Sequence, residues 1–328
     1  IELGMTFIDT AEGYGKGHSE ELIGQAIRQQ RERAFIATKF SPENNGYDDV
    51  LRAAERSLAR LQTDYIDLYQ VHWPNPAIPI EETMRAMERL VRDGKVRYIG
   101  LSNFSVPELK AAASIVDGLA IVSNQVEYNL FDRFIEKQIL PYCVENGISL
   151  VAYSPLDKGR VSTGDAVLEK IGSRYGKTAA QVTLNWLIHQ PNVIVIPKAT
   201  NSNHLRENAT SADFSMTDEE YREIGMAFSV EPALVPVDKI SVSVQGEGAR
   251  KVYQTLEEAL KNELHFSPSP KQLADEILKG EPIKPVRLVS AAAESDRFDL
   301  IEGRIRYWAW VIAHGGVAPI PALIRKSR

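Results

Sequence analysis

The sequence has a single cysteine, Cys143, among its 328 residues. It cannot form an intrachain disulfide, and we expect a reducing compartment, the cytoplasm, as its location. No apolar run approaches the roughly 20 residues that a membrane span requires, so we expect no membrane partner. These absences argue against a secreted, disulfide-stabilised protein and against an integral membrane protein.

The sequence also lacks a strong excess of one charge. Its net charge is −6, and hydrophobic residues make up 44% of it, which is typical of a globular protein. The part after residue 230 carries 14 Lys+Arg and 13 Asp+Glu, so it is +1 and the part before it is −7. Neither part is a strongly basic module of the kind that binds phosphate backbones non-specifically, which argues against a nucleic-acid partner.

A third absence is the Gly-x-Gly-x-x-Gly motif that follows the first strand of a Rossmann fold. Instead, short β-branched runs alternate with amphipathic helical segments up to about residue 209. The predicted strands are Thr6–Asp9, Phe35–Lys39, Asp67–Val71, Tyr98–Ser102, Ser123–Glu127, Ser149–Tyr153 and Val193–Pro197. The clearest predicted helices are Glu20–Arg28, Asp48–Leu61, Ile80–Asp93, Val106–Ser114, Ile135–Asn146 and Thr178–His189. In the helix Asp48–Leu61, one apolar stripe is predicted, and Arg52, Glu55, Arg56 and Arg60 lie off it. The stripe consists of Val50, Leu51, Ala54, Leu58 and Leu61.

Strict alternation with strands that are apolar on both faces predicts a parallel sheet covered by helices. Seven such strands fit a (β/α)8 barrel of TIM type that lacks one β/α unit better than they fit a doubly wound sheet. In a barrel of this type, the active site lies at the C-terminal ends of the strands.

The alternation stops after a helix predicted at 217–228, where Thr217 and Glu220 form a capping box. The segment Glu231-Pro-Ala-Leu-Val-Pro-Val breaks the pattern, and we predict a domain boundary at about 230–237. The chain would then consist of a barrel over residues 1–229 and a small α+β domain over residues 230–328. In the second domain we expect strands at 240–244 and 286–290, helices near 255–264 and 270–279, and a helix that begins near Arg304.

Four polar residues stand at the predicted strand ends. Asp9, Lys39 and His72 end or follow three successive strands, and Tyr14 lies in the loop after the first. In a parallel sheet these side chains would converge at one rim, in an arrangement that suits carbonyl reduction. Tyr14 would be the general acid, Lys39 would lower the phenol pKa, and Asp9 would hold Lys39 as an ion pair. His72 would orient the substrate oxygen. The alternative interpretation is a purely structural ion pair beside a core histidine.

The motifs around these residues resemble those of the aldo-keto reductases. The matching segments are Phe7-Ile-Asp-Thr-Ala-Glu-Gly-Tyr-Gly15, Glu20-Glu-Leu-Ile-Gly24, Ala37-Thr-Lys39, Gln70-Val-His-Trp73, Gly94-Lys-Val-Arg-Tyr-Ile-Gly-Leu-Ser-Asn-Phe104, Asn124-Gln-Val-Glu-Tyr-Asn129, Ala152-Tyr-Ser-Pro-Leu156 and Ile196-Pro-Lys-Ala-Thr200. They cover about residues 1–228. The resemblance implies an (α/β)8 barrel that reduces an aldehyde or ketone with NADP(H), without a Rossmann motif.

The resemblance also implies roles for individual residues. The catalytic tetrad would be Asp9, Tyr14, Lys39 and His72. The cofactor would be bound by Ser102, Asn103 and Gln125 at the carboxamide, Tyr153 on the nicotinamide, Ser154 and Leu156 at the pyrophosphate, Lys198 and Thr200 at the 2′-phosphate, and Glu207 and Asn208 near the adenine. Trp73 would wall the substrate site, or else be a core tryptophan. No metal is expected. His204 stands where the family often has an arginine, which leaves NAD(H) open beside NADP(H), although Lys198 supplies a phosphate partner.

Family members have an N-terminal hairpin, a first strand and a first helix before the segment that matches Ile1. We therefore expect that the first β/α unit is missing here and that the sequence is a partial one from an active reductase lineage.

The second domain resembles the ParB/sulfiredoxin-like nucleotide-binding fold in the segments Val237-Asp-Lys-Ile-Ser-Val242, Gly280-Glu-Pro-Ile-Lys-Pro-Val-Arg-Leu288 and Leu300-Ile-Glu-Gly-Arg-Ile-Arg-Tyr-Trp-Ala-Trp310. In that family a helix N-terminus and arginines face a phosphate, which here would involve Gly303, Arg304 and Arg306. The alternative is an ordinary amphipathic helix whose aromatic residues pack inward.

The sequence thus predicts an NADP(H)-dependent reductase of a small carbonyl substrate, with a nucleotide as the candidate partner of the second domain. The alternative is a non-catalytic, cofactor-sensing scaffold, as the channel-associated β subunits of the family suggest. Its second domain would then carry an activity linked to nucleotide or DNA.

Overall fold

The computed structural model describes residues 1–162, 164–229, 232–242, 253–264, 266, 268–290 and 296–325. Residue contacts divide the chain into two compact units, Ile1–Ser229 and Val230–Arg328, which are described separately below. Within the described residues, no helix is long and apolar enough to cross a membrane.

The first unit is built on a seven-stranded sheet in which the strands follow one another in chain order. They are β1 (Phe7–Asp9), β2 (Phe35–Phe40), β3 (Ile66–Val71), β4 (Val96–Ser102), β5 (Ile121–Glu127), β6 (Ser149–Tyr153) and β7 (Val193–Val195). Every neighbouring pair is parallel. The predicted parallel sheet is confirmed, with strand ends that differ by a few residues.

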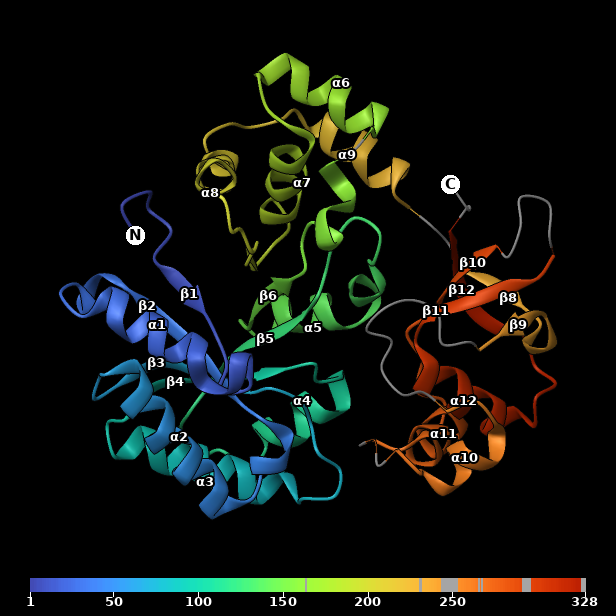
Figure 1. Cartoon of the computed structure of the whole chain (residues 1–328), viewed down its shortest axis with the longest axis horizontal. Coiled ribbons are helices and arrows are strands. Elements are labelled where there is room, and N and C mark those ends of the chain that lie inside the picture. The colour runs from blue at the N-terminus through green and yellow to red at the C-terminus, as the bar shows by residue number, and fades with distance from the viewer. Residues whose placement is uncertain are drawn as a thin grey trace. The chain divides into compact units, whose positions relative to one another are not determined.

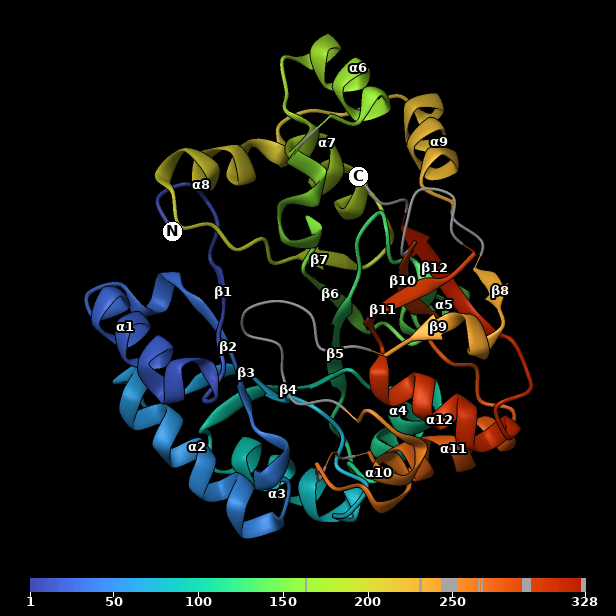
Figure 2. The same ribbon diagram turned by 45° about the vertical axis from the view of Figure 1, so that its right-hand side comes forward.

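The helices of this unit connect these strands or follow the last of them, and α1 to α4 clearly lie outside the curved sheet (Figures 1 and 2). They are α1 (His18–Ile27), α2 (Tyr47–Leu61), α3 (Ile80–Arg92), α4 (Val106–Ala113), α5 (Ile139–Glu145), α6 (Ala166–Tyr175), α7 (Ala179–Ile188), α8 (Ser202–Ala209) and α9 (Asp218–Ala227). The capping box predicted for α9 is present, with Thr217 and Glu220 exchanging hydrogen bonds.

The predicted helix Ile135–Asn146 is wrong as a single element. A short 3-10 turn (Phe134–Lys137) precedes α5, and the chain leaves helical geometry between them at Gln138, whose φ is −142°. Pro141 explains the break, because its ring has no N–H to donate and would clash with the carbonyl four residues earlier. Proline is tolerated where it stands, in the first turn of α5. The sequence also gave no prediction of α6 or α8.

Two apolar clusters pack the helices onto the sheet. One gathers mainly residues of β2–β4 and α1–α4, such as Ile36, Leu58 and Met87. The other gathers residues of β5–β7, α5, α6, α7 and α9, such as Leu150 and Trp186. The stripe predicted on α2 is confirmed, since Val50, Ala54, Leu58 and Leu61 are buried and its fifth member, Leu51, is half-buried. Polar residues at the strand ends are thus carried by a densely packed scaffold.

In its described residues, the second unit is a mixed five-stranded sheet with three helices. Its strands, in the order β8-β12-β10-β11-β9, are β8 (Ala233–Val235), β12 (Ile320–Arg325), β10 (Val286–Ser290), β11 (Phe298–Glu302) and β9 (Ile240–Ser241). Its helices are α10 (Leu256–Lys261), α11 (Pro270–Leu278) and α12 (Arg304–His314), which pack together (Figure 1). β8, β11 and β12 were not predicted, and residues 243–244 of the strand predicted at 240–244 lie outside the described residues.

Candidate active site

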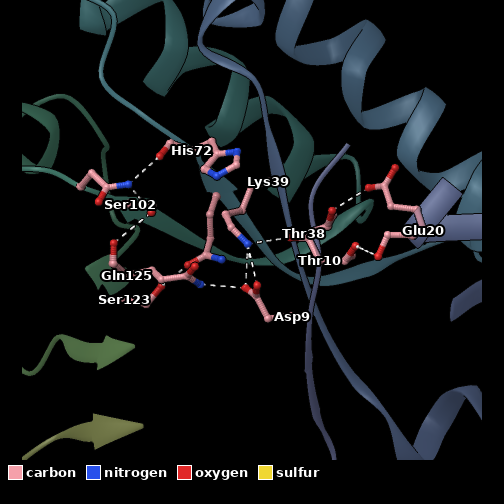
Figure 3. A network of polar contacts seen from close by, with 12 residues as sticks. Asp9, Thr10, Glu20, Thr38, Lys39, His72, Ser102, Ser123 and Gln125 are labelled. Carbon is pink, nitrogen blue, oxygen red and sulfur yellow. Dashed lines mark hydrogen bonds and ion pairs between the residues drawn. The ribbon is translucent and has the colours of Figure 1, made fainter. Parts of the chain in front are cut away.

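An ion pair between β1 and β2 forms the base of the predicted site. The Lys39 ammonium donates to both carboxylate oxygens of Asp9, at 2.9 and 2.7 Å, and to the backbone carbonyl of Thr10 at 2.7 Å (Figure 3). The Lys39 side chain is only 1% exposed and that of Asp9 10%. Three acceptors therefore occupy the three N–H groups of the ammonium, which is what a buried lysine requires to keep its charge.

Tyr14 and His72 lie next to this pair. The Lys39 ammonium is 5.0 Å from the centre of the Tyr14 ring, and the His72 ring meets the Tyr14 ring edge-on with 5.8 Å between centres. Tyr14 begins the 3-10 turn Tyr14–Gly17 and is 42% exposed, while His72 directly follows β3 and is half-buried. The structure thus brings the four residues together at one end of neighbouring strands.

The pKa of Tyr14 shifts in the direction opposite to the one expected. Burial, assisted by the nearby Asp9 carboxylate, raises the pKa of Tyr14 to about 12. The net shift is therefore opposite in direction to the lowering expected from Lys39, because burial of the phenol and the nearby Asp9 carboxylate both disfavour the phenolate. Burial also lowers the pKa of Lys39 itself, against the opposing effect of Asp9. Tyr14 is consequently a fully protonated phenol at neutral pH.

His72 is neutral at physiological pH. Burial, with a further contribution from the positive charge of Lys39, lowers the pKa of His72 to about 4. A neutral imidazole keeps one N–H, which can donate to a carbonyl oxygen without adding a second positive charge beside Lys39.

The three residues expected at the carboxamide of the cofactor form a chain of hydrogen bonds with the tetrad. The side-chain amide of Gln125 donates to the Asp9 carboxylate at 2.7 Å, and the Ser102 hydroxyl donates to the backbone carbonyl of Gln125 at 2.9 Å (Figure 3). Asn103 donates to the His72 carbonyl at 3.2 Å and to the Ser102 hydroxyl at 3.1 Å. This link between Gln125 and Asp9 was not predicted, and it joins the catalytic and cofactor parts of the predicted site.

The loop after β6 has unusual backbone geometry. Tyr153 is half-buried and donates from its hydroxyl to Asn103 at 3.1 Å. Ser154, Asp157 and Lys158 all have positive φ angles, of 51°, 44° and 57°, and Asn103 has one of 64°. Non-glycine residues seldom adopt this region, and such strain concentrates at binding and catalytic sites. Leu156 lies in the same loop and is half-buried.

The residues expected at the adenosine end lie apart from these interior contacts. Lys198 and Thr200 are exposed and precede α8, whose N-cap is Asn201. Glu207 and Asn208 are half-buried on α8 itself. A lysine and a helix N-terminus next to each other favour an anion, so the residues fit a phosphate group there.

Trp73 is 45% exposed, which contradicts the core interpretation of this residue. Its carbonyl accepts a hydrogen bond of 3.3 Å from Asn45, and it directly follows His72 at the rim of the site. Within the described residues, no group of three His, Cys, Asp or Glu side chains is placed to hold a metal ion.

In the second unit, Gly303 is the N-cap of α12 with a φ of 92°, and Arg304 and Arg306 are in the first turn. Arg306 donates to the carbonyls of Lys284 and Pro285, at 2.8 and 3.0 Å, so its guanidinium binds the protein. The Nε of Arg304 is buried, with no hydrogen-bond partner among the described residues.

The aromatic residues of α12 divide by burial. Tyr307 and Trp308 are buried in the core of the second unit, as the amphipathic interpretation expected, while Trp310 is half-buried.

Sequence reasoning missed a second ionic cluster beside the tetrad. Glu12 and Glu20 are buried and pair with Arg56 and Arg60 of α2, with N–O distances of 3.2 Å for Arg56–Glu12 and 2.6 Å for Arg60–Glu20. On the helical pattern of α2, both arginines lie off the apolar stripe and resemble solvent-exposed residues. No signal in the sequence distinguishes them from Arg52, which the structure places in an exposed pair with Asp49.

A parallel α/β barrel with an Asp–Lys–Tyr–His cluster at its strand ends defines the class of protein. The aldo/keto reductase family model matches residues 1–227, and the chain belongs to this family. Its fold is accordingly the (β/α)8 barrel of the family, with seven strands in the described residues.

Named relatives agree with this assignment. The chain is 40% identical over 232 residues to methylglyoxal reductase YeaE of Escherichia coli (strain K12), an alignment that covers 67% of this chain and 81% of the relative. It is 39% identical over 227 residues to glyoxal reductase of Bacillus subtilis (strain 168), covering 68% and 79%.

Solved structures agree as well. The thermostable aldo-keto reductase Tm1743, in complex with the inhibitor epalrestat, is 45% identical with a TM-score of 0.66, covering 70% of this chain and 84% of that one. The aldo-keto reductase from Klebsiella pneumoniae in complex with NADPH is 38% identical with a TM-score of 0.66, covering 69% and 81%.

Proposed function

We propose that the first unit is an NADP(H)-dependent oxidoreductase that reduces the carbonyl group of a small aldehyde or ketone. The observation that carries this proposal is the convergence of Asp9, Lys39, Tyr14 and His72 at one end of the strands. The relatives named methylglyoxal reductase and glyoxal reductase favour a short dicarbonyl as substrate. The related structure with bound NADPH favours the phosphorylated cofactor.

The reaction divides into a hydride and a proton transfer. Bound NADPH supplies the hydride that reduces the carbonyl carbon. Tyr14 donates its phenolic proton to the oxygen as negative charge develops there, and His72 donates its N–H to the same oxygen and orients it. Lys39, held by Asp9, places a positive charge beside the phenol as it becomes a phenolate.

The cofactor residues fit this assignment by their chemistry. Ser102, Asn103 and Gln125 offer amide and hydroxyl groups for a carboxamide, adjacent to Tyr153, whose ring can face a nicotinamide. Ser154 and Leu156 lie in the loop with positive φ angles, where the backbone can approach a pyrophosphate. Lys198, Thr200, Glu207 and Asn208 would hold the adenosine 2′-phosphate end. We propose Trp73 as a wall of the substrate site.

A steady-state assay with NADPH and methylglyoxal or 4-nitrobenzaldehyde tests the function. Tyr14→Phe removes only the hydroxyl, and we expect kcat to fall by about 10²–10⁴-fold while NADPH still binds. Tyr98→Phe is the matched control, because Tyr98 is 48% exposed on β4 and outside the site. Folded wild-type protein that binds NADPH and reduces no carbonyl would instead support the cofactor-sensing scaffold.

For the second unit we propose a ParB/sulfiredoxin-like domain that binds the phosphate of a nucleotide at the start of α12. The supporting observation is the buried Arg304 Nε without a partner in the described part of the chain, next to Gly303 at the helix N-terminus. Binding of a fluorescent ATP analogue to the full chain, saturated beforehand with NADP⁺, should be lost in Arg304→Ala. It should persist in Lys279→Ala, which changes an exposed cation of the same unit.

A further inference from the structure

The loop that carries Tyr14 is anchored at both ends to helix α2. Glu12 lies two residues before Tyr14, and Glu20 lies in the first turn of α1, six residues after it. Their carboxylates meet Arg56 and Arg60, which are one helical turn apart on α2. The segment between the two carboxylates includes Tyr14 and has no regular helix or strand apart from the 3-10 turn and the start of α1.

Arg60 makes the closest of these contacts. Its guanidinium is 2.6 Å from the Glu20 carboxylate and 4.0 Å from that of Glu12, and the side chain is 20% exposed. It also lies against Gly17, the last residue of the 3-10 turn that begins at Tyr14. A Cβ on Gly17 would be 2.6 Å from the Arg60 Cδ, and the φ of Gly17 is 94°. Only glycine allows the loop to approach the arginine this closely.

The same two carboxylates reach the strand that carries Lys39. Glu20 accepts a hydrogen bond of 2.6 Å from the hydroxyl of Thr38, the residue before Lys39 (Figure 3). Glu12 accepts hydrogen bonds from the backbone N–H of Ser41 at 2.7 Å and from the Asn44 amide at 2.6 Å. Each carboxylate thus connects one end of the segment that carries Tyr14 both to the end of β2 and to helix α2.

We propose that Arg56 and Arg60 are positioning residues for the general acid, which hold the Tyr14 loop over the Lys39–Asp9 pair through Glu12 and Glu20. This inference rests on the proposed function, with Tyr14 as the proton donor. Proton transfer requires the phenol to lie within hydrogen-bond reach of the substrate oxygen, and a loop released at either end would sample other positions.

Three arginines of α2 provide a matched test. Arg60→Lys keeps the charge but loses the planar group that reaches both carboxylates, and Arg56→Gln removes one anchor. Arg52→Gln is the control, since Arg52 is 62% exposed and its ion pair with Asp49 lies at the surface. We expect kcat to fall by about 10- to 100-fold in Arg60→Lys and less in Arg56→Gln, with the Kd of NADPH unchanged. A merely structural role would lower the unfolding temperature and leave the kcat of the folded protein unchanged.

A second measurement follows Tyr14 without turnover. 3-Fluorotyrosine at position 14 should give one fluorine resonance displaced from that of the free amino acid. This resonance should broaden or move toward the free value in Arg60→Lys and Arg56→Gln, and stay in place in Arg52→Gln.

The outcomes separate the two proposals. If the wild type reduces carbonyls but both arginine variants match Arg52→Gln in kcat and fluorine spectrum, the positioning role is refuted. If the wild type reduces no carbonyl, the proposed function fails, and the fluorine spectra alone decide whether the arginines fix the position of residue 14. Should Arg60→Lys not fold, Arg56→Gln decides, because Arg56 is 46% exposed and its loss leaves Arg60 in place.

Discussion

Two ends of the same sheet each hold a carboxylate with little exposure, Asp67 at the N-terminal ends of β2–β4 and Asp9 at the C-terminal ends of β1–β3. Asp67 accepts from Arg31 at 2.7 Å, from Arg97 at 2.8 Å and from the Ile36 N–H at 2.9 Å. Both guanidinium groups also stack on the Tyr65 ring, at 3.9 and 4.0 Å from its centre. At this end, the charged side chains and the Tyr65 ring contact one another, which indicates a structural role.

Asp9 is held as firmly, by Lys39 and Gln125, but its surroundings differ. Beside it stand a protonated phenol and a neutral imidazole, Tyr14 and His72, whose pKa values are both shifted by burial. This difference between the surroundings of Asp67 and Asp9 shows that a buried ion pair is not by itself evidence of a catalytic site. What marks the site is a pair of titratable side chains next to the ion pair and open to a ligand.

Lys39→Met should have the largest effect, because it leaves Asp9 buried without its cation. We expect a loss of about 3–5 kcal/mol in the free energy of unfolding, measured by urea denaturation, together with loss of carbonyl reduction. A variant with unchanged stability would show that the pair contributes nothing to the fold.

Arg31→Met removes a cation at the opposite end of the sheet, so its effects on stability and kcat can be compared with those of Lys39→Met. Asp67 keeps Arg97 and the Ile36 N–H, so we expect a loss of only about 1–3 kcal/mol in the free energy of unfolding. The kcat of the folded protein should equal that of the wild type at a temperature well below unfolding. A drop in kcat similar to that of Lys39→Met would break the distinction between the two ends.

The pH dependence of stability follows from His72. Its pKa is about 4 in the folded protein and about 6.5 when unfolded, so the unfolded state binds more protons at pH values between these. The stabilisation is complete above pH 6.5 and is lost as the pH falls toward 4, by about 1–2 kcal/mol after allowance for solvent screening. Urea denaturation at several pH values should show this loss, and His72→Gln should remove that part of it.

Lys198→Met should have the smallest effect on stability, because the side chain is exposed. We expect a change within about 0.5 kcal/mol in the free energy of unfolding. The Kd for NADPH should rise by about tenfold while that for NADH stays the same, since only NADPH carries the 2′-phosphate. Equal weakening of both cofactors would place Lys198 elsewhere in the site.

The fold of the first unit was predictable because its signals are local. Strand runs and the apolar stripe of α2 are read from neighbouring residues, and both are confirmed. Of the two missed helices of this unit, α8 has the weaker local signal. In α8 no residue is buried, so it shows no apolar face. The predicted helix around Pro141 followed the apolar pattern across a position where the backbone cannot continue.

The candidate site was predictable in its members but not in its electrostatics. Strand ends and family motifs pointed to Asp9, Tyr14, Lys39 and His72, and the structure brings them together. The predicted direction of the Tyr14 pKa shift was wrong, because the pKa depends on burial of the phenol and on the nearby Asp9 carboxylate. Neither quantity is a property of the residues taken singly.

The alternation of strands and helices, the members of the four-residue cluster and the family of the chain can all be recognised in the amino-acid sequence. Periodicity indicates the alternation, the residue types at the strand ends indicate the cluster, and the family follows from the matching motifs. Only the tertiary structure decided that Arg56 and Arg60, but not Arg52, meet the buried carboxylates of the Tyr14 loop. The three arginines have the same spacing on one helix, and what separates them is the packing of α1 and the loop against the end of α2, which involves residues about 40 positions apart.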